Sequence, residues 1–187
     1  MNGRVRRGML AAVLIATLTA TVGPASAVGA STCRGARARP SSSTIGTAAA
    51  ATLCVVNQVR HTYRLRPFRM NPVLRRIASG QSHDMFVGGY FGDDSLSGLT
   101  PMQRVTASPY ARGSASLSVS QNIAWGDAWE STPTAIVTSW LQSGPHREAL
   151  LASGFKEVGV GISLGDPWNP SSKVGAIYTL DLAARGN

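Results

Sequence analysis

The sequence predicts a single α+β domain in which helices cover a small, mainly antiparallel sheet of about three strands. The apolar patterns follow one another in the order helix, helix, strand, helix, strand, strand. The last two strands are separated by a short loop rich in Gly and Pro, so they most simply pair as an antiparallel hairpin. With so few strands, helices must cover the sheet faces, which favours a sandwich over a doubly wound parallel sheet.

The first two helices follow from their apolar spacing and their end signals. The first is expected to begin near Gly46 and to end before Pro67, because the residue that precedes a proline avoids the helical conformation. Its apolar residues recur at helical spacing and form one face: Leu53, Val56, Val59 and Tyr63. The second is expected to have Asn71 as N-cap and Pro72 as first residue, and to end at the glycine pair 88–89.

A long irregular connection is expected to follow the second helix. Residues 92–114 are rich in Gly, Ser, Asp and Pro, with one short helix expected at 101–107. Segments of this kind often carry function. A strand is then expected over 117–125, where apolar and polar residues alternate. The alternation places Gln121 on the inward face of that strand, among apolar neighbours.

A third long helix is expected to begin at Thr132-Pro133 and to be interrupted at Gly144-Pro145. A further helical segment is expected to start with Ser143 as its cap and to stop before Gly154. This segment carries His146 in its first turn.

The last two strands are expected over 157–163 and 174–182. Gly159 and Gly161 lie within the first of them, where glycine usually permits close approach of another backbone.

The N-terminal segment is typical of secretion. In residues 1–27, arginines precede an apolar run that is too short to span a membrane comfortably, and Ala25-Ser26-Ala27 fits the small-x-small cleavage pattern. An N-terminal membrane anchor is the alternative. We expect residues 28–45 to form a flexible tail and 46–187 to form one domain, with no transmembrane anchor after processing.

Export would place the two cysteines in an oxidising compartment, where cysteines tend to pair. A disulfide between Cys33 and Cys54 would tie the tail to the first helix. In the chain-entropy model, a loop of this length contributes about 3 kcal/mol. Two separate buried thiols are the alternative.

The charge balance argues against a nucleic-acid-binding protein. The chain has 18 basic and 9 acidic residues, and removal of three arginines with the signal peptide leaves 15 − 9 = +6. No basic stripe interleaved with aromatic residues is present, so no nucleic-acid partner is expected. Attraction to anionic cell-surface polymers is consistent with this charge, and a monomer is expected.

His146 is the strongest functional candidate among the three histidines. The positive end of a helix dipole disfavours its imidazolium form, and a neutral imidazole can accept a proton or bind a metal ion. A capping or packing role is the alternative. His83 is expected to be a partly buried structural histidine and His61 a surface one. The adjacent Asp93 and Asp94 suit either a solvated turn or a cation site.

Well-known nucleophile and metal motifs are missing from the sequence. It has no His-Glu-x-x-His, no phosphate-binding glycine loop and no spare cysteine, and its one Gly-x-Ser-x-Gly match, residues 161–165, lies in an expected strand and the loop after it rather than at a strand-to-helix elbow. We therefore assign no catalytic residue, no metal ligand and no cofactor from the sequence.

Five segments in order resemble the CAP superfamily, also called SCP, which comprises cysteine-rich secretory, antigen 5 and pathogenesis-related proteins. These segments are residues 57–60, 89–91, 121–126, 140–147 and 157–161. The resemblance is to the short secreted bacterial branch and covers about residues 50–182. It implies an α-β-α sandwich and identifies 46–187 as a CAP domain.

The resemblance also implies a polar pocket that is altered in this chain. The family pocket typically has a histidine after Tyr-Phe-Ser, a glutamate that opens Glu-Asn-Ile-Ala, and a histidine in Ser-Pro-Gly-His-Arg. His146 matches the second histidine, whereas Asp93 stands at the first histidine position and Gln121 at the glutamate position. A glutamine cannot act as a general base, and an aspartate is a hard oxygen ligand. An Asp93–His146 carboxylate–imidazole pair beside Gln121 is what we expect to remain.

These departures lead to the expected function. We expect a secreted, non-catalytic CAP module that binds a lipid, a glycan or another cell-envelope component through a degenerate pocket formed by His146, Gln121 and Asp93. The alternative from the enzyme class is a hydrolase that uses His146 with Asp93, with or without a metal ion. A stable scaffold without a functional pocket is the third hypothesis.

Overall fold

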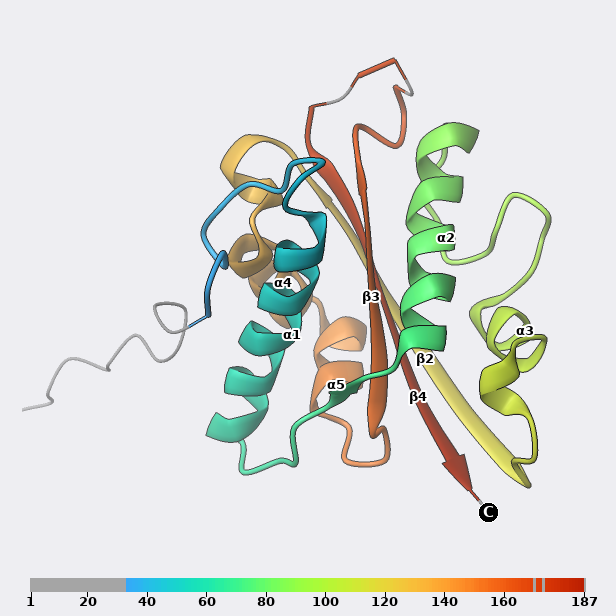
Figure 1. Ribbon diagram of the computed structural model, residues 1–187. Helices are drawn as coiled ribbons and strands as arrows, with labels where there is room; N and C mark the ends of the chain where they lie inside the picture. The colour runs from blue at the N-terminus through green and yellow to red at the C-terminus, as the bar shows by residue number, and fades with distance from the viewer. Residues whose placement is uncertain (1–32, 170, 173, 187) are drawn as a thin grey trace, which may run out of the picture.

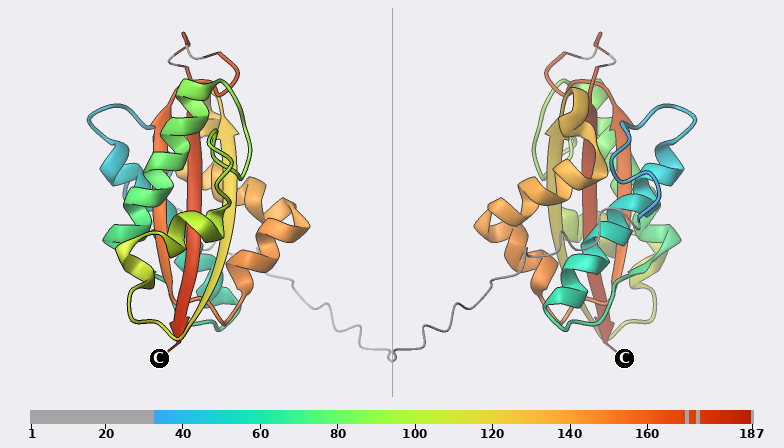
Figure 2. Two further views of the ribbon diagram at one scale, coloured as in Figure 1. Left: turned by 90° about the vertical axis from the view of Figure 1, so that its right-hand side faces the viewer. Right: turned by 90° about the vertical axis from the view of Figure 1, so that its left-hand side faces the viewer.

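The computed structural model describes residues 33–169, 171–172 and 174–186, and these residues form an α-β-α sandwich (Figure 1). The predicted signal peptide, residues 1–27, lies outside the described residues. The described helices are α1 (Ile45–Thr62), α2 (Pro72–Gly88), α3 (Pro101–Thr106), α4 (Pro133–Gln142) and α5 (Gly144–Leu151), with short 3-10 helices η1 (Pro109–Ala111) and η2 (Ala128–Ser131). Helices α1, α4 and α5 cover one face of the sheet, and α2 and α3 cover the other (Figures 1 and 2). This arrangement confirms the predicted fold class.

The sheet has four described strands in the order β1-β3-β4-β2. They are β1 (Arg69–Met70), β2 (Ser116–Gly126), β3 (Glu157–Leu164) and β4 (Ala176–Gly186). The predicted hairpin is confirmed as the antiparallel β3–β4 pair, and β2 pairs antiparallel with β4. The sequence predicts about three strands and misses β1, because a strand of two residues is too short to show an alternating pattern.

Helix α2 begins and ends as its sequence signals predict. The Asn71 side chain accepts hydrogen bonds from the backbone N–H groups of Val73 and Leu74, at 2.9 and 3.3 Å. Gly89 ends the helix in the left-handed conformation, with φ of 67°. These local signals are readable from the sequence because they depend on neighbouring residues only.

The backbone of α2 lies directly against strand β3. A Cβ atom added to Gly159 would lie 2.1 Å from the carbonyl carbon of Leu74, and one added to Gly161 would lie 2.1 Å from that of Ala78. No side chain fits at either position, so the expected close approach of another backbone is confirmed.

The N-terminal segment from Cys33 is anchored to the domain, although the sequence predicts a flexible tail over 28–45. Cys33 forms a disulfide with Cys54 in α1, which confirms the predicted pairing. Ala36 is buried, and its carbonyl oxygen accepts hydrogen bonds from the backbone N–H and the hydroxyl of Thr134, each at 2.9 Å. These contacts correct the expected tail for its part from Cys33 onward.

Arg60 accounts for a second difference from the sequence prediction, at the end of α5. Its guanidinium is buried and donates hydrogen bonds to the carbonyl oxygens of Leu150 and Ala152, at 2.6 and 3.0 Å. Ala152 is extended, so α5 ends at Leu151 rather than just before Gly154. The sequence shows no signal for a contact between residues this far apart.

The C-terminal ends of helix α1 and strand β4 also differ from the predicted ones. Helix α1 ends at Thr62, well before Pro67, and the Tyr63 side chain is exposed rather than part of the buried face. Strand β4 continues to Gly186, because β2 pairs with it along its whole length.

In the described part of the chain, we find no helix with the length and apolar character needed to cross a membrane.

The close approach of α2 to β3 leads to a testable stability difference. We expect Gly161→Ala to lower the free energy of unfolding by about 3 kcal/mol or more, because the new methyl group must displace helix backbone. Gly80→Ala in α2 is the matched control, because nothing lies within 4 Å of a Cβ atom added there. This substitution should stabilise the protein by up to about 1 kcal/mol. Urea denaturation followed by tryptophan fluorescence measures both. Equal stabilities for the two variants would contradict this packing.

Candidate functional site

The three residues singled out in the sequence lie around the edge strand β2. Gln121 is on this strand and half-buried, His146 is in the first turn of α5 and half-buried, and Asp93 is exposed on the loop that follows α2. The charge of Asp93 acts on both His146 and Asp181 of β4, so these groups share one electrostatic environment. They come from both faces of the sheet and meet at its β2 edge.

The expected direct pair between Asp93 and His146 is not formed. No hydrogen bond or ion pair joins the two side chains, and the ion pair found within the described residues links Arg185 to Glu157. The backbone, rather than the ring, of His146 is held in place: Asn122 of β2 donates a hydrogen bond to its carbonyl oxygen at 3.0 Å. The imidazole and the carboxylate are therefore neighbours in the electrostatic sense only.

Asp181 is a functional candidate that the sequence analysis missed. It lies opposite Gln121 in the register of β4 and β2, and its side chain is fully buried. The Gln121 amide donates a hydrogen bond to its Oδ1 at 2.6 Å. The second oxygen, Oδ2, and the Oε1 atom of Gln121 have no hydrogen-bond partner in the structure. The available signal was a single carboxylate in the apolar strand 176–183, because a buried charge calls for a compensating partner.

The pKa of Asp181 is raised to about 6, chiefly by burial. The hydrogen bond from Gln121 and the charge of Arg104 lower this pKa, and the charge of Asp93 raises it. The Asp181 carboxyl therefore titrates in mildly acidic solution.

Burial lowers the pKa of His146, and the charge of Asp93 opposes this shift. His146 is therefore neutral at neutral pH, when its ring can both donate and accept a hydrogen bond. The Gln121 amide remains neutral throughout.

The loop that carries Asp93 is held by side chains of α2 and α3. Gln81 of α2 donates a hydrogen bond to the carbonyl oxygen of Gly92 at 2.9 Å. Arg104 of α3 donates one to the carbonyl oxygen of Asp93, also at 2.9 Å. The hydroxyl of Tyr90 donates to Asp84 at 2.6 Å. The predicted irregular connection is thus fixed by specific hydrogen bonds, which determine where Asp93 lies.

Neither of the other histidines belongs to the site. His61 is exposed, as expected, and His83 is also exposed, so the expectation of a partly buried structural histidine is wrong. The reason is that His83 lies on the outer side of α2, whose inner side rests on β3. Within the described residues, no three His, Cys, Asp or Glu side chains gather closely enough to hold one metal ion.

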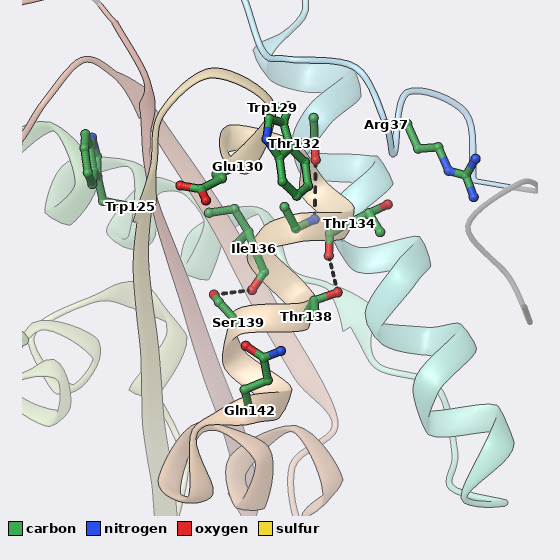
Figure 3. A pocket seen from close by; sticks show the side chains of 11 residues that line it. Arg37, Trp125, Trp129, Glu130, Thr132, Thr134, Ile136, Thr138, Ser139 and Gln142 are labelled. Carbon is green, nitrogen blue, oxygen red and sulfur yellow. Dashed lines mark hydrogen bonds between the residues drawn. The ribbon is translucent and has the colours of Figure 1, made fainter.

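Four hollows on the surface of the described residues lie elsewhere. One of them is a groove of about 580 Å³ along α4 (Figure 3). Trp129, which is 70% exposed, lies at one end of this groove and Gln142 at the other, with Ile136 between them (Figure 3). The side chain of Trp125 points away from it (Figure 3), and its ring centroid lies 5.5 Å from that of Trp168. None of the four hollows is lined by His146, Gln121 or Asp93.

The buried carboxyl of Asp181 leads to a prediction about pH. Because its pKa in the folded protein lies above the ordinary value of 3.8, its stabilising contribution is present at low pH and is lost as the pH rises from about 4 through 6. Between pH 4 and 7, wild-type protein should lose about 2 kcal/mol of stability relative to Asp181→Asn.

The measurement is the free energy of unfolding in urea for both proteins across this pH range. Glu148→Gln, which removes an exposed carboxylate on α5, serves as the control and should keep the wild-type pH dependence. A constant difference between wild type and Asp181→Asn at every pH would show that Asp181 has an ordinary pKa.

Comparisons with known proteins agree with this fold. A model of the CAP family, the cysteine-rich secretory protein family, matches residues 53–178. The Bacillus subtilis protein YkwD is 28% identical over 115 residues, which cover 61% of this chain and 42% of YkwD. The chain thus spans less than half the length of this curated relative.

Solved structures with the same fold include three bacterial proteins. An extracellular SCP-domain protein from Bacillus anthracis has a TM-score of 0.60 and 21% identity, over 79% of this chain and 44% of that chain. A cysteine-rich secretory protein from Staphylococcus aureus has a TM-score of 0.56 and 20% identity, over 76% and 40% of the two chains. An outer surface protein from Borrelia burgdorferi has a TM-score of 0.55 and 19% identity, over 70% and 87%. The family model covers most of the sandwich, and the chain belongs to the CAP family of cysteine-rich secretory proteins.

Proposed function

We propose that this protein is a secreted, non-catalytic CAP module that binds a glycan of the cell envelope at the β2 edge of the sheet. The observation that carries the proposal is the pair of buried oxygens, Oδ2 of Asp181 and Oε1 of Gln121, that lack a hydrogen-bond partner. A buried acceptor without a partner costs free energy, and a donor from a ligand would recover it. The hydroxyl groups of a sugar are such donors.

The groups around these oxygens suit a polar ligand. His146 in its neutral form and Asp93 at the rim offer further acceptors and donors to hydroxyl groups. Asp93 and Arg104 both act on the charge of Asp181, which indicates that the loop after α2 and helix α3 lie beside it. A ligand would enter between this loop and β2, and a change in the Gln121 side chain would give it access to the buried oxygens.

Secretion of the protein is part of the proposal. The predicted signal peptide and the Cys33–Cys54 disulfide both suit an oxidising compartment outside the cytoplasm. The similar proteins from Bacillus anthracis and Borrelia burgdorferi are described as extracellular and as an outer surface protein.

Two other functions have a specific observation in their favour. A lipid would suit the groove along α4, where the exposed Trp129 provides apolar surface (Figure 3). A hydrolase would use the neutral imidazole of His146 as a general base, with the charge of Asp93 raising its pKa. We favour the glycan, because neither alternative provides hydrogen-bond donors for the buried oxygens of Asp181 and Gln121.

The test is binding of soluble oligosaccharides, released from purified cell envelope, to the secreted protein by isothermal titration calorimetry. His146→Ala and Gln121→Ala should each weaken binding tenfold or more, a change of about 1.4 kcal/mol. Gln142→Ala, an exposed amide at the end of the α4 groove, is the matched control and should bind as wild type does.

The outcomes separate the functions. Identical binding by wild type and both site variants would remove the β2 edge from the function. Loss of binding in Gln142→Ala, with palmitate as the better ligand, would instead favour the lipid. Release of cleaved product, detected by mass spectrometry and abolished in His146→Ala, would establish the hydrolase.

A further inference from the structure

One end of the sheet carries basic residues from or beside all four described strands. This end is formed by the start of β1, β2 and β3 and by the end of β4, close to the C-terminus (Figure 2). Arg69 pairs with Glu157 in the register of β1 and β3, and Arg185 lies near the end of β4. Arg112 precedes β2, and Lys156 precedes β3. The topology therefore gathers charges that are widely separated in the sequence.

A hollow of about 280 Å³ lies among these side chains. Its lining consists of charged, polar and glycine residues: Arg69, Arg112, Gly113, Ser114, Lys156, Glu157 and Arg185. Four of the lining side chains are cations and one is an anion. No aliphatic or aromatic side chain lines it, so a ligand would be held by charge and hydrogen bonds.

The single carboxylate in the hollow is already satisfied. Glu157 accepts hydrogen bonds from Asn71 at 3.0 Å and from Tyr110 at 2.9 Å, and it forms an ion pair with Arg185 at 3.4 Å. Arg185 also lies over the ring of Tyr110, with the guanidinium carbon 4.4 Å from the ring centroid. Burial opposes ionisation of Glu157, but Asn71, Tyr110 and Arg185 together keep its pKa below the ordinary value.

The other three cations of the hollow have no such partner. Among the described residues, no hydrogen bond or ion pair involves the side chain of Arg69, Arg112 or Lys156, and all three residues are exposed. Like charges gathered around one hollow repel each other, and an anion bound between them would relieve this repulsion.

The geometry points to a binding site for the phosphate groups of an anionic phosphodiester polymer of the cell envelope. A tetrahedral phosphate presents oxygens in several directions and suits cations that come from separate strands, whereas one arginine fork can satisfy a planar carboxylate. In this proposal, the hollow holds one phosphate group of the polymer between Arg69, Arg112 and Lys156.

The surface around the hollow favours a polymer over a membrane. Further exposed arginines lie in the segment before β1 and near the start of α2, which follows β1: Arg64, Arg66, Arg75 and Arg76. Three of the exposed large apolar side chains, Trp129, Trp168 and Val174, belong to η2 and the β3–β4 loop, toward the opposite end (Figure 1). Tyr63 is exposed at the end of α1, where its hydroxyl accepts a hydrogen bond from Arg147 at 3.0 Å, and it does not line the hollow. A membrane-binding surface normally places such side chains next to its basic residues.

The test is binding of poly(glycerol phosphate) to the full-length secreted protein at low and high salt. Arg69→Gln combined with Arg112→Gln should weaken binding tenfold or more at low salt, and salt should weaken wild-type binding strongly. The matched control is Arg34→Gln combined with Arg39→Gln, which removes the same charge from exposed residues of the N-terminal segment. This control should bind within about twofold of wild type, with all proteins shown to be folded by circular dichroism.

Three further ligands identify the anion and its source. Polygalacturonate, vesicles of equal parts phosphatidylglycerol and phosphatidylcholine, and inorganic phosphate should each bind more weakly than the polymer at equal anion concentration. Equal losses in the two double variants would reduce the effect to net charge and overturn the proposal. Vesicles, polygalacturonate or inorganic phosphate binding as tightly as poly(glycerol phosphate) would overturn it as well, as would failure of the polymer to bind. Oligosaccharide binding at the β2 edge is unaffected by any of these outcomes.

Discussion

The direct contact between the backbone of α2 and two glycines of β3 is the constraint on which the rest of the structure depends. Because Gly159 and Gly161 have no side chain, α2 lies closer to the sheet than an ordinary helix does. The position of α2 then fixes Gln81 and, through it, the loop that carries Asp93. Helix α3 is joined to the same loop through Arg104. One packing requirement thus determines where the polar groups meet β2.

Burial of Asp181 explains why a glutamine at position 121 is compatible with this site. The two residues are opposite each other on adjacent strands, and their side chains are in contact at 2.6 Å. Two carboxylates at that distance would repel, and one would have to be protonated. The resemblance to the CAP family implies a glutamate where Gln121 stands. In this chain the carboxylate is on β4 instead, and the neutral amide of Gln121 provides it with a hydrogen-bond donor.

Local features of the sequence predicted much of the fold. The parts that the sequence did not predict depend on contacts between residues far apart in the chain. Asn71 and Gly89 marked the ends of α2, and the alternating glycines of β3 indicated a close backbone, because each signal lies within a few residues. The short strand β1 exists only through its pairing with β3. Whether Asp93 and His146 pair directly could not be predicted from the sequence, because tertiary hydrogen bonds determine the position of the loop that carries Asp93. The role of Asp181 was not predictable either, because only the pairing of β4 with β2 places it opposite Gln121.

The two proposed binding sites have no residue in common, and this separation has a consequence for the kind of ligand that fits both. The β2 edge offers neutral and acidic acceptors, which suit hydroxyl groups, while the strand ends near the C-terminus present unpaired cations, which suit phosphates. A polymer that carries sugars and phosphodiesters along one chain could engage both sites at once. Linked contacts of this kind raise the overall affinity well above that of either site, because the second contact forms at a high effective concentration. Weak individual sites would therefore suffice to retain a small secreted domain at the cell surface.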